Sequence, residues 1–63
     1  MIKKGSIVKF KKPFPDEDPN QLFVVLEVLK GQRTDAKIMA LGTEMNIPPV
    51  YVFPLDDLVL ADI

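Results

Sequence analysis

The stretch Gln21–Leu29, QLFVVLEVL, decides the fold of this chain. Its residues are β-branched, aliphatic or aromatic apart from Gln21 and Glu27, and so short an apolar run is more typical of a buried strand than of a helix. Both alternating faces are apolar: one carries Leu22, Val24, Leu26 and Val28, and the other carries Phe23, Val25 and Leu29. We therefore predict that this segment is a central strand covered on both faces.

Shorter strands are predicted before and after this segment. In residues 6–12, Val8 and Phe10 alternate with lysines, which is the two-residue period of a half-buried strand. Residues 50–53, VYVF, form a further predicted strand that ends at a proline. Residues 55–58 favour one turn of tight helix, and a last short strand follows at 59–61.

Residues 36–41, AKIMAL, fit a helix by propensity, but only six residues precede Gly42. We predict an antiparallel strand here and keep a helix as the alternative. The polar, glycine-containing residues 30–35 then form a hairpin connection to the central strand.

Two loops separate these segments. Residues 13–20, PFPDEDPN, contain three prolines and three acidic residues, which excludes a helix interior and a central strand. Residues 42–49 end in two prolines, which favour extended backbone. Residues 16–20, DEDPN, together with Glu27 match the ligand spacing of a calcium loop. Gln21, however, stands where that loop needs glycine, so we interpret the acidic run as a solvated surface.

The sequence of segments resembles the SH3-like small β-barrel family. The residues that carry the resemblance are GSIV at 5–8, VVLEV at 24–28, AKI at 36–38 and VFPLDDLV at 52–59. It implies that residues 1–63 form a single all-β domain: a five-stranded barrel with a short helical turn before the last strand. In peptide-binding members the long first loop, here residues 13–21, helps to form the ligand groove. The tryptophan of that groove is missing, because the chain has none.

Composition argues against catalysis and against metal or cofactor binding. The chain has no cysteine and no histidine, so it lacks disulfides, thiolate or imidazole ligands, and a histidine base or cysteine nucleophile. A phosphate-binding glycine loop is also absent from the sequence. We expect a protein that is not an enzyme, with no cofactor and no small-molecule substrate.

The apolar runs are too short for a signal peptide or a membrane span. The longest extends from Leu22 to Leu26, and the basic N-terminal residues lead into Gly5. We expect a soluble, cytoplasmic protein that does not associate with membranes.

Lysines concentrate near the N-terminus, where residues 1–12 contain five of them and no acidic residue. Lys9, Lys11, Lys12 and Phe14 could bind nucleic acid, the lysines through phosphates and Phe14 by stacking on a base. The net charge of −1 and the pI of about 5.1 oppose binding to a polyanion. We keep nucleic-acid binding as the alternative function.

The leading hypothesis is a non-catalytic module that binds protein. If Leu22 and its alternate neighbours fill the barrel, an apolar patch remains outside, made of Phe23, Val25, Tyr51 and Phe53. Such a patch is typical of a protein interface, and the partner could be a second copy of the chain. The opposite reading is that so small a barrel buries parts of both faces. A third hypothesis is a subunit of a larger assembly.

Overall fold

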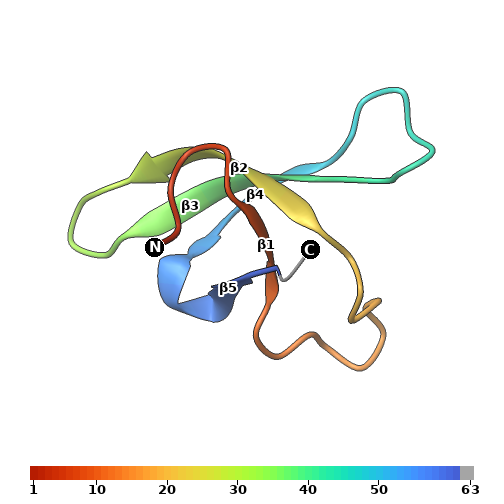
Figure 1. Ribbon diagram of the computed structural model, residues 1–63, viewed down its shortest axis with the longest axis horizontal. Coiled ribbons are helices and arrows are strands. Elements are labelled where there is room, and N and C mark those ends of the chain that lie inside the picture. Colours follow the sequence, from red (N-terminus) through yellow and green to blue (C-terminus); the bar gives the residue numbers. More distant parts are fainter. Residues whose placement is uncertain (62–63) are drawn as a thin grey trace.

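One antiparallel sheet of five strands makes up the structure, a computed structural model that describes residues 1–61 (Figure 1). The elements in chain order are β1 (Ile7–Phe10), β2 (Phe23–Leu29), β3 (Asp35–Ala40), β4 (Val50–Pro54), the 3₁₀ turn η1 (Leu55–Asp57) and β5 (Leu58–Leu60). Their order across the sheet is β4-β3-β2-β1-β5, so β2 is the central strand. The all-β fold, the five strands and the turn before the last strand are confirmed, and residues 36–40 are strand.

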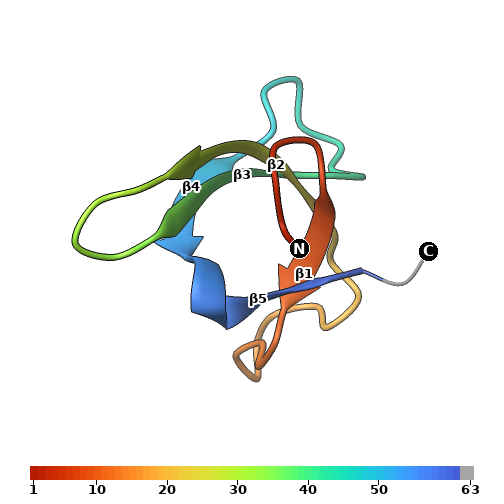
Figure 2. The same cartoon turned by 60° about the vertical axis from the view of Figure 1, so that its left-hand side comes forward.

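The sheet curves strongly, so that its two end strands approach each other around η1 (Figure 2). Within residues 1–61, however, no ladder of hydrogen bonds joins β4 to β5. The barrel expected from the sequence is therefore not closed, because η1 separates the two strands at this corner. Nearby contacts are single backbone bonds: Leu55 N–H donates to the Thr34 carbonyl and Lys11 N–H to the Asp57 carbonyl, both at 2.9 Å. No helix in the described chain is long and apolar enough to cross a membrane.

The core lies on the concave side of the sheet. Seven buried apolar residues form it: Val8, Phe23, Val25, Ala36, Ile38, Ala40 and Leu58. Partly buried side chains complete its rim, namely Ile2, Phe10, Val28, Phe53 and Leu55. Four of the five strands contribute to the core, and β4 contributes only to the rim.

The predicted interface patch depended on Phe23 and Val25 of β2 pointing outwards, but β2 directs both side chains into the core. Phe23 is 3% exposed and Val25 is 1% exposed, so both belong to the core. They lie opposite Ala40 and Ile38 of β3, respectively. The inward face of β3 carries only apolar residues and its outward face includes charged Lys37, so pairing with β3 turns Phe23 and Val25 inward.

A bulge at Leu26 explains how β2 can be apolar on both faces. The register with β3 shifts between Val25 and Glu27, which leaves Leu26 as the additional residue. After the bulge, Val28 lies opposite Ala36 and packs against the core, while Glu27 lies opposite Lys37. The core-facing positions of β2 therefore change from odd to even numbers along the strand.

We expect the Ile38→Val substitution to lower the free energy of unfolding by about 0.5–1.5 kcal/mol, because Ile38 is fully buried and its lost methylene leaves a cavity. Urea denaturation followed by circular dichroism measures this change. The matched control is Ile47→Val, the same chemical change at a side chain that is 85% exposed, for which we expect a change within about 0.5 kcal/mol. Equal effects at both positions would contradict the assignment of Ile38 to the core.

Candidate functional site

A cluster of four aromatic rings extends from the core to the surface. The ring centroid of Phe10 lies 4.9 Å from that of Phe23 and 4.9 Å from that of Phe53. Tyr51 completes the cluster at 6.2 Å from Phe23 and 6.0 Å from Phe53. These separations are those of favourable tilted and edge-to-face pairs. Phe23 is buried at the base, whereas Tyr51 is 43% exposed.

Two hollows adjoin above these rings and share Phe10 and Phe53. The first has a volume of about 390 Å³ and is also lined by Lys11, Lys12, Phe14 and Asp57. The second has a volume of about 300 Å³, and its further lining residues include Glu17, Asp18, Thr43, Pro49 and Tyr51. We call the two hollows together the aromatic groove.

The first loop, residues 11–22, forms one wall of the aromatic groove and is shaped by two reverse turns. In the turn that begins at Phe14, Glu17 N–H donates to the Phe14 carbonyl at 2.9 Å. In the turn that begins at Asp18, Gln21 N–H donates to the Asp18 carbonyl at 3.1 Å, and Asn20 N–H donates to Asp18 Oδ1 at 2.8 Å. Proline is the second residue of both turns, where its fixed φ favours the turn. The acidic loop is thus an ordered wall.

The side chain of Gln21 ties this wall to the loop that follows β3. Its Nε2 atom donates to the carbonyl of Leu22 at 2.8 Å and to that of Leu41 at 2.7 Å. Leu41 N–H in turn donates to the Leu22 carbonyl at 2.9 Å. The sequence analysis named Gln21 as the residue that breaks the calcium-loop pattern but gave its side chain no structural role. The signal available was a lone amide directly before an apolar strand.

Charge differs between the two ends of the aromatic groove. Lys11 and Lys12 line the first hollow together with one carboxylate, Asp57, whereas the charged residues of the second hollow are Glu17 and Asp18. Among residues 1–61 the structure has one ion pair, between Arg33 Nε and Asp35 Oδ1 at 2.8 Å, and it lies outside the aromatic groove. Within the described residues, therefore, no ion pair engages the charged side chains of the groove, and Asp18 accepts a hydrogen bond from Asn20 N–H.

The predicted interface residues do not form one surface. Tyr51 and Phe53 line the aromatic groove, Phe23 contributes only to its floor and is 3% exposed, and Val25 lies in the core. The expectation that Phe23 and Val25 are exposed is wrong, because β2 turns this face towards the core, on the same side of the sheet as the buried residues of β3. The correct surface partners of Tyr51 and Phe53 are Phe10 and residues of the first loop.

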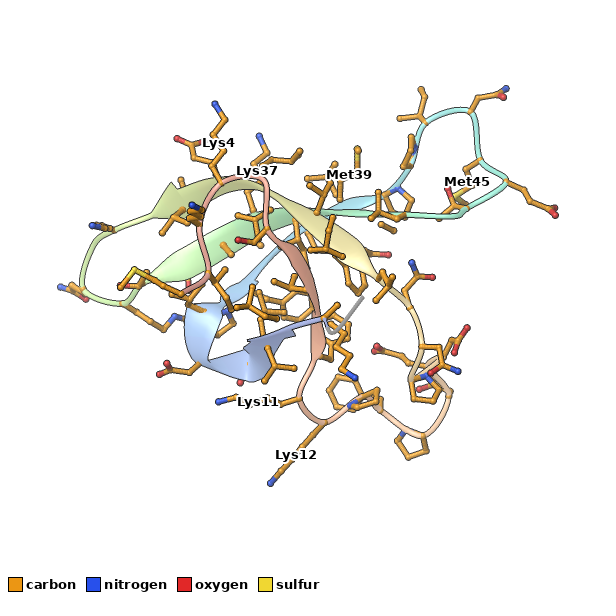
Figure 3. The ribbon with its side chains drawn as sticks, viewed as in Figure 1. Lys4, Lys11, Lys12, Lys37, Met39 and Met45 are labelled. Atoms are coloured by element: carbon orange, nitrogen blue, oxygen red, sulfur yellow. The ribbon has the colours of Figure 1, made fainter. Side chains whose placement is uncertain are left out.

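The predicted nucleic-acid residues are partly brought together. Lys11, Lys12 and Phe14 line the first hollow, whereas Lys9 alternates with the core residue Val8 and points to the other face of β1. Figure 3 draws Lys11 and Lys12 on one side of the molecule and Lys4 and Lys37 on the opposite side. The lysines therefore do not gather on a single basic face.

The aromatic groove offers rings and exposed charges, which are groups suited to binding.

Comparisons with protein-family models, with curated proteins and with solved structures found no match. No charged or polar side chain within residues 1–61 is buried, and no three potential metal ligands gather there. The interpretation of the site therefore depends on its own geometry.

We expect the Gln21→Met substitution to lower the free energy of unfolding by about 1–2 kcal/mol, because two hydrogen bonds are lost and the Leu41 carbonyl loses a donor. The amide hydrogen of Leu41 should also exchange faster with solvent, as measured by NMR. Gln32→Met, in an exposed part of the β2–β3 loop, is the matched control and should change neither quantity. An unchanged exchange rate at Leu41 in the Gln21 variant would contradict the proposed tie.

Proposed function

We propose that this protein is a non-catalytic interaction module that binds an extended segment of another protein in the aromatic groove. The observation that carries the proposal is the pair of adjoining hollows joined by Phe10 and Phe53. Tyr51 and Phe14 stand beside them, 43% and 65% exposed respectively. Exposed aromatic side chains next to a hollow are typical of protein interfaces.

The charges at the two ends define the chemistry of the ligand. An apolar or proline-containing centre would pack on the rings of Phe10, Tyr51 and Phe53. A lysine or arginine of the ligand would reach Glu17 and Asp18, and an acidic group would reach Lys11 and Lys12. The ligand class is therefore a short extended peptide that carries opposite charges on either side of an apolar centre.

The fold also supports this proposal. We infer an SH3-like barrel that stays partly open between β4 and β5. Support comes from the strand order β4-β3-β2-β1-β5, the long loop after β1 and the position of η1. In peptide-binding members of the family that the sequence resembles, the groove also lies beside the long first loop.

Nucleic acid is less well suited to the same surface. Lys11, Lys12 and Phe14 could contact a phosphate and a base, but Asp57 shares their hollow. Glu17 and Asp18 line the adjoining hollow and would repel a second phosphate. A nucleic-acid strand could therefore use only one end of the aromatic groove.

Selection from a displayed library of random twelve-residue peptides tests the proposal. We expect the selected peptides to combine a basic residue with an apolar or proline centre. Fluorescence anisotropy with a selected peptide should show that Phe14→Ala weakens binding about tenfold, the effect of losing an aromatic contact of ~1.4 kcal/mol. Glu17→Lys should weaken binding of the basic peptide by repelling its charge.

Val52→Ala is the matched control, because Val52 lies on β4 but outside the groove lining, and this variant should bind like the wild type. Single-stranded oligonucleotides at low salt form the second arm. Salt-dependent oligonucleotide binding without peptide binding would replace the proposal with the nucleic-acid function. Peptide binding unchanged in both groove variants would place the ligand elsewhere.

A further inference from the structure

Strand β4 leaves one hydrogen-bonding edge open. It is the first strand in the order across the sheet and pairs only with β3. Ala40 N–H donates to the Pro49 carbonyl at 3.0 Å, and Leu55 N–H donates to the Thr34 carbonyl at 2.9 Å. Backbone N–H and C=O groups point to opposite edges of a strand at successive residues. Pro49 bonds to β3 and Leu55 to the residue directly before β3, so the backbone groups of the alternate residues between them, Tyr51 and Phe53, also point towards β3. Val50 and Val52 therefore direct their N–H and C=O groups away from the sheet.

Two prolines limit this open edge. Pro48 and Pro54 point their backbone towards the same open edge as Val50 and Val52, but proline has no N–H group to donate. Between the prolines, the edge offers two donors and two acceptors, all on the two valines. Val50 is 45% exposed and Val52 is 54% exposed, and no further backbone bond to either is present among the described residues.

Charged residues do not protect this edge, although the opposite edge of the sheet is protected. Strand β5 has only three residues and directly follows Asp56 and Asp57. Strand β4 has no charged residue at all. Monomeric proteins usually guard an open edge with charge, proline, shortness or a bulge; prolines stand at both ends of the β4 edge, and only the two valines between them are suited to pairing with another strand.

Exposed apolar side chains also concentrate here. Of the eight strongly exposed large apolar residues in the described chain, five belong to residues 45–52: Met45, Ile47, Val50, Tyr51 and Val52. The loop that contains Met45 projects away from the body of the molecule beside β4 (Figure 3). Pairing along β4 would thus bury apolar surface in addition to forming backbone bonds.

We propose that β4 pairs with β4 of a second copy of this chain, antiparallel, around a two-fold axis at Tyr51. In this register Val50 lies opposite Val52 of the second copy, and the two pairs form four N–H···O bonds. A shift by two residues places a valine opposite a proline, which leaves one valine carbonyl on each copy without a donor. The Tyr51-centred register is therefore the one in which every backbone group between the prolines is paired.

A second copy fits this edge better than a charged foreign strand. The strand is neutral, so self-pairing places no like charges opposite each other. The cross-strand row Ile7, Val24, Met39 and Val50 is apolar on the outer face, and in the proposed register it continues to Val52 of the second copy. This dimer is a property beyond peptide binding, because neither valine lines the aromatic groove.

Sedimentation equilibrium of the full chain tests the proposal, with twice the 7.1 kDa chain mass expected for the wild type at high micromolar concentration. Val52→Pro removes two of the four intermolecular bonds but no bond to β3, so we expect the dimer to dissociate about tenfold more readily. Leu60→Lys is the matched control: it adds charge at a 48% exposed position on the other edge strand and should leave the dimer intact.

A pair of double variants tests the register and does not depend on proline being tolerated. V50K/V52K places lysines opposite lysines in the proposed register and should be monomeric. V50K/V52E carries the same number of new charges but places each lysine opposite a glutamate, so the dimer should be retained. Circular dichroism confirms folding of each variant.

Three results would overturn the inference. The first is a wild-type chain that stays monomeric at about millimolar concentration. The second is a dimer that dissociates in the Leu60→Lys variant but not in the Val52→Pro variant. The third is equal dissociation of the V50K/V52K and V50K/V52E dimers. Peptide binding is measured separately on dilute monomer, with Phe14→Ala as its reporter, so failure of dimerisation and failure of the proposed function are distinguishable.

Discussion

Pairing between β2 and β3 is the constraint on which the rest of the structure depends. The inward face of β3 consists of Ala36, Ile38 and Ala40, and its outward face includes Lys37. Burying a lysine without a partner costs far more free energy than exposing an aliphatic side chain. Strand β3 must therefore direct its Lys37 face to solvent and its Ile38 face to the core. Register with this strand then turns Phe23 and Val25 of β2 inward. The core and the base of the aromatic cluster both follow from that orientation.

The aromatic groove is the outer rim of this core. Phe23 lies beneath Phe10 and Tyr51, so the rings that close the core on one side form the floor of the groove on the other. Groove residues therefore differ in whether they stabilise the fold or are available only to a ligand. Phe10 and Phe53 pack against the core and stabilise the fold, whereas Phe14 is exposed and is available to a ligand without being needed for folding.

Strand β4 serves two surfaces because its residues alternate. Tyr51 and Phe53 contribute their rings to the aromatic cluster and their backbone groups to the ladder with β3. Val50 and Val52 have neither role, and their backbone groups remain open. The gap between β4 and β5 has the same origin: η1 takes the chain away from the sheet directly after β4, so no neighbouring strand covers this edge.

The sequence by itself determined where the strands lie, because two-residue periodicity and proline are local signals. It identified β1, the strand character of residues 36–40, the proline-rich loop at residues 13–20 and the surface residues Lys11, Lys12 and Phe14. Only the tertiary structure decided which face of β2 is buried. Both faces are apolar, so burial energy alone does not separate them. The choice came from the charged face of β3 and the bulge at Leu26, and both act through a partner strand distant in sequence.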